Sequence, residues 1–498
     1  MARFPAQLRQ ALIAFALAQF ICSFAGSNMN VMITDISDDL NTTVQGVQLA
    51  ITLFLLVMAA LMIPGGKLTD RLGRKWCLVA GLLLFAAGAL LSSFAQNLPL
   101  LIIGYSVFEG VGTALLIPPV YILTTLLFTG VAARARAFGL ISAMGGVGAV
   151  TGPLIGGFVA SVIHWRAAFV LQALICLLIV VLSRKAVTDP LPADKSKPFD
   201  TGGAVLSALG LILIVNGILL ADNNVLAMIG LLVAGALVLT WFFLSVRAKE
   251  RAGREPLLST ALFHNRTSNL GLVTQNTQWL MVMGSSFVIS TYLQVVRGYN
   301  AIETGAVFTA TTVGVLISSL SAERMAQRRP QRTLIMGGFL ITIAGIALLL
   351  AAGGTAGSVW GMVPGLFVIG LGLGVMLTPS VNVVQSAFPE HLQGEISGLS
   401  RSVSNLGSSL GAALTGTILV AGVDGAAPGR AYLWAMCSVA AAGVIGLAAA
   451  SFLPRTGPAN PGAATDPSPD PGQPAAATGP ITDPGQPAAA TGPITEPG

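Results

Sequence analysis

One acidic residue stands where an ionisable group could do chemistry inside a membrane. Glu109 falls near the middle of an apolar segment, residues 99–121, about 15 Å from the segment's end at the rise of an α-helix. An ionised carboxylate at the centre of a bilayer costs about 2.5–3.5 kcal/mol on insertion scales, so such a residue indicates a function. We expect Glu109, with Ser106 one turn before it, to exchange a proton, to attract a cation, or to do both in competition. The structural alternative is a protonated carboxyl that is hydrogen-bonded between helices.

The composition requires a membrane around this carboxyl. Hydrophobic residues make up 54% of the 498 residues, only 9% are charged, and the mean hydropathy is +0.80. In a typical soluble domain, about a quarter of the residues are charged. Apolar runs of about 20 residues, long enough to cross a bilayer as helices, recur along the chain. The sequence therefore predicts an all-α polytopic membrane protein.

Fourteen apolar segments are long enough to span a bilayer. We predict helices at residues 11–34, 45–65, 76–96, 99–121, 136–160, 166–183, 201–221, 224–246, 270–293, 303–322, 333–353, 360–382, 396–420 and 431–453. With the N-terminus in the cytoplasm, the Lys and Arg residues fall almost entirely in cytoplasmic connectors, as the positive-inside rule requires. The exceptions are Arg166, Arg297 and Arg430 outside, and Arg401 inside a helix. This distribution places both termini in the cytoplasm and argues against a nucleic-acid partner.

Charged connectors divide the chain into parts. We predict a six-helix bundle at residues 1–190, a two-helix insert at 191–250, and a second six-helix bundle at 251–453. Residues 454–498 are rich in Pro, Gly and Ala, and the run Asp470–Thr482 recurs as Asp483–Thr495. Such a segment cannot bury a core, so we expect a disordered cytoplasmic tail with a 13-residue repeat.

The segment between the second and third helices carries the most specific motif. Residues 66–75, the signature loop, read Gly-Lys-Leu-Thr-Asp-Arg-Leu-Gly-Arg-Lys. Asp70 stands among four cations, and Gly66 and Gly73 permit a sharp turn. The pattern resembles the signature loop of the major facilitator superfamily. That resemblance implies that Asp70, Arg71 and Arg74 take part in a latch between the two bundles, with the region near 394–398 as the partner.

A second motif lies in the fifth predicted helix. Gly148, Gly152, Pro153, Gly156 and Gly157 match a Gly-x-x-x-Gly-Pro-x-x-Gly-Gly pattern that is similar to that of the superfamily's antiporters. Glycines four apart allow close helix approach, and the proline allows a bend. The resemblance favours export, although the motif could serve packing alone.

Further segments resemble the fourteen-helix drug:proton antiporter branch, including Trp165, Arg166 and Phe169 and the glycines Gly398, Gly407 and Gly411. Two departures concern proton coupling. Ser106 and Glu109 stand where the branch has arginine and glutamine, and Ala25 stands where many relatives carry a buried aspartate.

The first helix of each bundle also carries a polar cluster. The clusters are Ser27, Asn28 and Asn30, and Gln275, Asn276 and Gln278. Polar side chains facing lipid are costly, so these should point inward, either into a substrate cavity or into hydrogen bonds between helices. Their corresponding positions in the two halves favour a cavity.

These observations predict a transporter and not an enzyme, with no cofactor and no metal site. We expect proton-coupled efflux of small amphipathic or cationic drug-like molecules by alternating access, in a protein that functions as a monomer. One alternative is a dedicated exporter of a metabolite, lipid or siderophore, with or without proton coupling. Another is a membrane sensor or scaffold that transports nothing.

Overall fold

The computed structural model describes residues 5–128, 131–190, 193, 199–220, 224–355, 359–388, 393–423 and 428–455. Within these ranges the secondary structure is helical and contains no strand. The predicted tail lies outside the described residues apart from Pro454 and Arg455.

Ten elements precede the insert, and two of the membrane segments change helix type along their length. The first segment comprises α1 (Ala6–Asn28), η1 (Met29–Met32) and α2 (Ile33–Asp39), and the fourth comprises α5 (Leu98–Leu101), η2 (Ile102–Glu109) and α6 (Gly110–Leu127). The others are α3 (Val44–Leu72), α4 (Arg74–Ser93), α7 (Val131–Val162) and α8 (Trp165–Ala186).

The insert and the second bundle follow. The insert is α9 (Thr201–Leu219) and α10 (Val225–Arg251). A short turn, η3 (Thr260–Phe263), leads into α11 (Arg266–Thr291), which continues as η4 (Tyr292–Val296). The remaining elements are α12 (Ala301–Arg328), α13 (Gln331–Thr355), η5 (Val359–Met362), α14 (Val363–Gln385), α15 (Gln393–Val423) and α16 (Pro428–Ser451).

The predicted class, an all-α protein with fourteen membrane-length segments, is confirmed. Thirteen segments among the described residues are both long and apolar enough to cross a bilayer. The fourteenth, α15, is 31 residues long but rich in serine and glycine. Its polarity has a physical reason: α15 packs against α3 on one side and α11 on the other, so its polar side chains avoid lipid.

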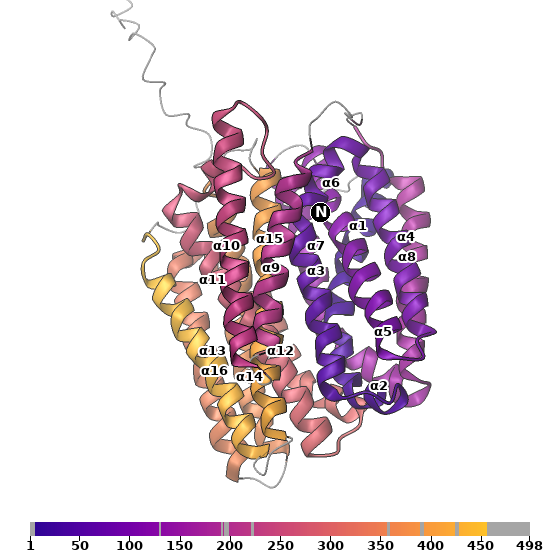
Figure 1. Ribbon diagram of the computed structural model, residues 1–498, viewed down its shortest axis with the longest axis vertical. Helices are drawn as coiled ribbons and strands as arrows, with labels where there is room; N and C mark the ends of the chain where they lie inside the picture. Colours follow the sequence, from indigo (N-terminus) through magenta and orange to yellow (C-terminus); the bar gives the residue numbers. More distant parts are fainter. Residues whose placement is uncertain are drawn as a thin grey trace, which may run out of the picture. The chain divides into compact units, whose positions relative to one another are not determined.

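The helices pack as two groups joined along seams. In the first group α1 packs on α7 and α8, and α4 packs on α6 and α8; in the second, α11 packs on α15 and α16, and α13 on α14. Two seams, α3 with α15 and α7 with α12, join the groups. Figure 1 shows α1, α4 and α8 on one side and α13, α14 and α16 on the other. We call the end that carries residues 66–75 the inner end, and the opposite end the outer end.

The insert lies along the α3–α15 seam. Helix α9 contacts both α3 and α15, and Val215 is buried with Leu56 and Ala413 from those two helices. Helix α10 packs on α9. At Gly235, a Cβ atom would lie 3.0 Å from the Gly210 carbonyl oxygen, so the two helices touch through small residues.

Asp200 joins the inner ends of α9 and α10 to the connector that follows them. Its carboxylate accepts from Gly203 N–H (2.7 Å) as the cap of α9, from Lys249 Nζ (2.6 Å) on α10, and from Leu257 N–H (3.3 Å). Burial by itself would raise the pKa of Asp200, but the Lys249 ammonium and the two backbone N–H groups outweigh burial and lower that pKa below 3.8.

We expect Asp200→Ala to lower the free energy of unfolding by about 0.5–2 kcal/mol through the lost cap alone. Asp200→Asn isolates the charge. Folding lowers the pKa of Asp200. The Asp200 charge therefore contributes fully to the free energy of unfolding at pH values above the pKa of the unfolded chain, and this contribution is lost as pH falls through the pKa of the folded protein. Thermal unfolding of purified protein should therefore show a difference between wild type and Asp200→Asn at neutral pH that shrinks below about pH 4. A difference independent of pH would contradict this assignment.

Candidate functional site

Glu109 lies inside the first bundle, fully buried at the junction of η2 and α6. Neither of its carboxylate oxygens has a hydrogen-bond partner among the described residues. The side chains of Cys22 on α1, Tyr105 on η2 and Cys176 on α8 share this interior region. The hydrogen-bonded alternative for Glu109 is therefore not what the structure shows, and the carboxyl is held in an apolar surrounding.

The backbone that carries Glu109 is not a regular α-helix. Residues Ile102–Glu109 form a π-helix, a rare conformation that is frequent at functional sites. This segment fits tightly against α4, because a Cβ atom at Gly88 would lie 2.6 Å from the Gly104 carbonyl oxygen. Ser106 points elsewhere than predicted, since its hydroxyl donates to the Ala50 carbonyl of α3 (2.7 Å).

The interior around Glu109 reaches the part of α1 around Ala25. Tyr105 Oη donates to the Ala25 carbonyl oxygen (3.1 Å), and Cys22 lies one turn earlier on the same helix. Thr113, one turn after Glu109 on α6, neighbours the Cys22 thiol and donates to the Glu109 carbonyl (2.8 Å). Glu109 thus approaches, from the end of η2, the stretch of α1 that lacks an acid.

The predicted polar cluster of α1 divides between two neighbours. Ser27 bonds within its own helix, to the carbonyls of Ser23 (3.1 Å) and Phe24 (3.2 Å), and faces Gly152 of α7. Asn28 is fully buried with no partner for its amide among the described residues. Asn30 instead faces α11, where its Nδ2 lies 3.6 Å from Met283 Sδ.

Gln294 at the outer end joins the two bundles and was not among the predicted site residues. Its Nε2 donates to the Asn30 carbonyl (2.9 Å) and its Oε1 accepts from the Thr34 hydroxyl (3.1 Å). Ser290 donates to the same Asn30 carbonyl. That carbonyl is available because α1 gives way to the 3₁₀ turn η1 at this point. We call these four residues the outer seal; the broken helix and the π-helix η4 that form it leave no local sequence pattern.

The α11 cluster is used mainly within its own bundle. Gln275 Oε1 accepts from the Ser400 hydroxyl (2.9 Å) and Asn276 Nδ2 donates to the Val403 carbonyl (2.9 Å), both on α15. Gln278 is buried, with neither amide atom bonded among the described residues. The structure therefore does not gather the six predicted residues into one cavity.

The glycine motif of α7 has two distinct faces. A Cβ atom at Gly148 or Gly152 would overlap atoms of α1, and one at Gly156 would lie 2.8 Å from Asn28 Cβ. Gly157 and Pro153 face α12: a Cβ atom at Gly157 would overlap the Ala301 carbonyl, and one at Gly305 would lie 2.6 Å from the Pro153 carbonyl oxygen. The motif thus packs α7 both within its bundle and across the seam.

The signature loop is mostly helical. Helix α3 continues to Leu72, so Gly66 lies within it; the turn occurs at Gly73, whose φ of 97° favours glycine. The prediction of a turn is confirmed for Gly73 and was wrong for Gly66. Asp70 pairs with Arg74 in the same loop (2.7 Å), and Asp189 accepts from Arg74 N–H (2.7 Å) to cap α4. Arg71 is half-buried at the end of α3.

The two bundles do meet near residues 394–398, but through a different residue than expected. Lys67 Nζ pairs with Glu395 Oε1 at 2.7 Å, so the cation before the aspartate carries the link. A second link lies deeper: Arg401 donates to the Tyr121 hydroxyl and stacks on that ring, 4.7 Å from its centre. Tyr121 in turn donates to Gln19 Oε1 (3.1 Å) on α1. We call Lys67, Glu395, Arg401 and Tyr121 the inner gate.

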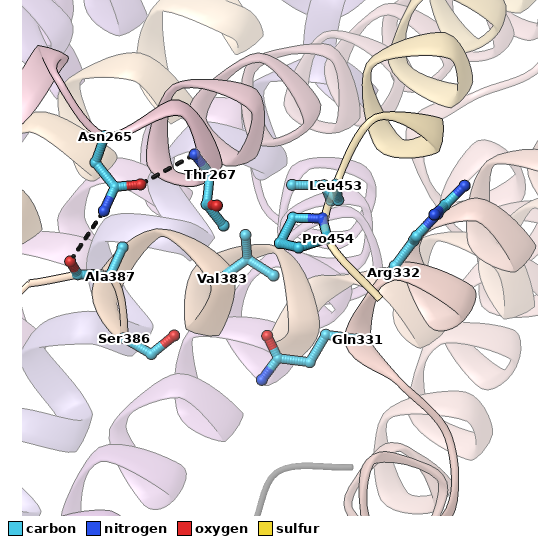
Figure 2. Close-up of a pocket in the computed structure, with 9 residues that line it drawn as sticks. All are labelled: Asn265, Thr267, Gln331, Arg332, Val383, Ser386, Ala387, Leu453 and Pro454. Carbon is cyan, nitrogen blue, oxygen red and sulfur yellow. Dashed lines mark hydrogen bonds between the residues drawn. The ribbon is translucent and has the colours of Figure 1, made fainter. Parts of the chain in front are cut away.

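A pocket of about 220 Å³ opens at the inner end of the second bundle, away from these residues. It is lined by residues at the ends of α11, α13, α14 and α16: Asn265, Thr267, Gln331, Arg332, Val383, Ser386, Ala387, Leu453 and Pro454. Figure 2 shows the Asn265 amide bridging Ala387 and Thr267 across one edge. No residue of the predicted cavity lines it.

Comparison with known proteins identifies the class of protein that this arrangement defines. The sequence profile of the Major Facilitator Superfamily matches residues 15–412. The chain belongs to that superfamily and is a multi-span membrane transporter.

Similar proteins include puromycin resistance protein pur8 of Streptomyces alboniger, 29% identical over 412 residues that cover 82% of this chain and 81% of that protein. Multidrug efflux pump LfrA of Mycolicibacterium smegmatis (strain ATCC 700084 / mc(2)155) is 28% identical over 426 residues, 84% of this chain and 82% of the pump. The crystal structure of the peptide transporter POT in complex with sulfate has a similar fold, with a TM-score of 0.65 and 18% identity over 90% of this chain and 96% of that one.

The α1–α7 contact gives a direct stability test. Gly148→Ala should lower the free energy of unfolding by about 1–3 kcal/mol, because its Cβ atom would overlap the Phe20 carbonyl. Gly146→Ala on the same helix is the matched control, since no atom lies within 4 Å of its added Cβ; it should be neutral or slightly stabilising. Thermal unfolding in detergent measures both, and equal effects would contradict the proposed packing.

Proposed function

We propose that this transporter exports small amphipathic or cationic drug-like molecules in exchange for protons, by alternating access between the inner and outer ends. The observation that carries the proposal is the buried carboxyl of Glu109, whose oxygens have no partner among the described residues. The similarity to pur8 and LfrA, whose names describe antibiotic resistance and multidrug efflux, supports the direction and the kind of cargo.

The position of Glu109 supports a role in proton exchange. A carboxyl in an apolar interior favours the protonated form and ionises only when water or a cation reaches it. Alternating access supplies that change of surroundings, because a midplane site is exposed first to one side and then to the other. Protonation and cargo binding would then compete for one carboxylate, and the proton gradient would supply the energy.

The missing aspartate at Ala25 fits this assignment. Tyr105 bonds to the Ala25 carbonyl, and Glu109 shares the interior with Tyr105 and Cys22. The acid on η2 thus approaches the stretch of α1 where the resemblance implies an aspartate and Ala25 stands instead. A single acid suits neutral or singly charged cargo better than divalent cations.

Both ends of the bundle interface are bonded in this structure, which supports alternating access. The outer seal holds α1 to α11 through neutral hydrogen bonds, whereas the inner gate uses an ion pair and a stacked arginine. Opening the outer end requires the outer seal to break, and opening the inner end requires the inner gate and neighbouring α3–α15 bonds, such as that of Ser402 to the Ala59 carbonyl, to break. The proposed orientation places the inner end, with its basic loops, in the cytoplasm.

Efflux of a fluorescent lipophilic cation from cells expressing the chain tests this function. Glu109→Gln should reduce efflux to the level of cells without the protein, because glutamine cannot exchange a proton. A proton uncoupler should have the same effect on wild type. The control is Glu255→Gln, an exposed acid in the connector after α10, which should export normally.

Normal, pH-dependent efflux by Glu109→Gln would contradict the role of this residue. Efflux by wild type that continues unchanged in the presence of the uncoupler would contradict proton coupling. It would not affect the assignment of the fold. Absence of efflux for a panel of cations, in a protein shown to be at the membrane, would instead favour a dedicated cargo.

A further inference from the structure

The connector after the two-helix insert touches the inner gate directly. Ser259 N–H donates to Glu395 Oε2 (3.2 Å), while Glu395 Oε1 accepts from Lys67 (2.7 Å). Each oxygen of this gate carboxylate therefore has one partner, one from the first bundle and one from the connector. A carboxylate held on one oxygen by a fixed backbone donor loses less conformational freedom when it pairs with a cation.

The backbone around Ser259 is itself held by the insert. Leu257 N–H donates to Asp200 at the start of α9, and Thr260 N–H donates to Glu250 Oε1 (2.7 Å) near the end of α10. The Thr260 hydroxyl donates to the other oxygen of Glu250. The Ser259 N–H thus lies between two backbone donors that are bound to carboxylates of the insert.

The two leucines before Ser259 anchor this connector in the fold. Leu257 is fully buried with Phe242 and Val246 of α10, and Leu258 is 2% exposed in a cluster with Ile396 and Leu399 of α15. Ile63 of α3 packs against both clusters. The connector therefore lies in the α3–α15 seam: Leu257 packs on α10 of the insert, and Leu258 packs on α15, the helix that carries Glu395.

We propose that the insert is a working part of the inner gate: it positions Glu395, through the Ser259 N–H, for the ion pair with Lys67, and so stabilises the state in which the inner end is closed. Ser259 is in this account a positioning residue, and Glu395 is the group that it positions. The inference rests on alternating access in the proposed function, but it concerns the gate and not the cargo.

Ser259→Pro removes the N–H donor with little change of backbone, because the φ of Ser259 is −72°, close to that of proline. Ser259→Ala is the matched control: it removes the hydroxyl that bonds to Ala261 N–H but keeps the donor. The readout is the rate at which a maleimide labels Ala59→Cys in a chain whose four cysteines are replaced. Ala59 is fully buried in the seam, and its carbonyl accepts from Ser402 of α15, so fast labelling reports an open inner end.

In detergent, Ser259→Pro should be labelled about tenfold faster than Ser259→Ala, the factor that losing one hydrogen bond to a charged group produces in a two-state equilibrium. In the Glu395→Ala background the two variants should be labelled at the same rate, because the acceptor is absent. Equal rates with Glu395 present would overturn the proposal. So would a proline effect that persists without Glu395, since it would show local damage instead of positioning.

If Ser259→Pro does not give a monodisperse protein, Glu250→Ala replaces it, because it frees the neighbouring Thr260 N–H. It should also speed labelling when Glu395 is present and have no effect when Glu395 is absent; any other result overturns the proposal. The assay uses neither cargo nor a proton gradient, so failure of the efflux experiment and failure of this one are distinguishable.

Discussion

A bilayer core offers no hydrogen-bond partners, and this constraint governs the structure. Polar side chains must turn inward and bond to one another, so they collect on the surfaces where helices meet. Helix α15 follows this rule: it is rich in serine, and its serines bond to α3 and α11 across two interfaces. Glu109 departs from this rule, as the amides of Asn28 and Gln278 do: each is buried without a partner among the described residues. An unpaired acid is costly in such a surrounding, which is the physical reason for assigning function to it.

The two ends of the bundle interface use different chemistry. Neutral amide and hydroxyl groups close the outer end around Gln294, whereas charged groups close the inner end around Glu395. Ion pairs exposed to water contribute little and break readily, while hydrogen bonds in a dry interface depend on exact partners. The insert adds a further element at the inner end, because its connector occupies the same seam as the gate.

Much of the fold could be predicted from the sequence, because long apolar runs and the distribution of basic residues determine the segments and their alternation. The burial of Glu109 and the turn at Gly73 followed from the same local information. The neighbour that each face of a helix contacts could not be predicted from this local information. Gln275 and Asn276 bond within their own bundle, and Lys67, not Asp70, makes the link between bundles. The π-helix at Ile102–Glu109 and the break in α1 depend on packing against neighbours such as Gly88, which no local pattern encodes.

The central claim is that one carboxyl on η2 exchanges a proton for cargo. The most direct test is proton release from purified protein in weakly buffered detergent when a saturating lipophilic cation is added, for wild type and Glu109→Gln. The account predicts release of about one proton per protein from wild type and none from Glu109→Gln, with cargo binding measured in parallel. Equal release from both proteins would show that the exchanged proton belongs to another group and would contradict the account.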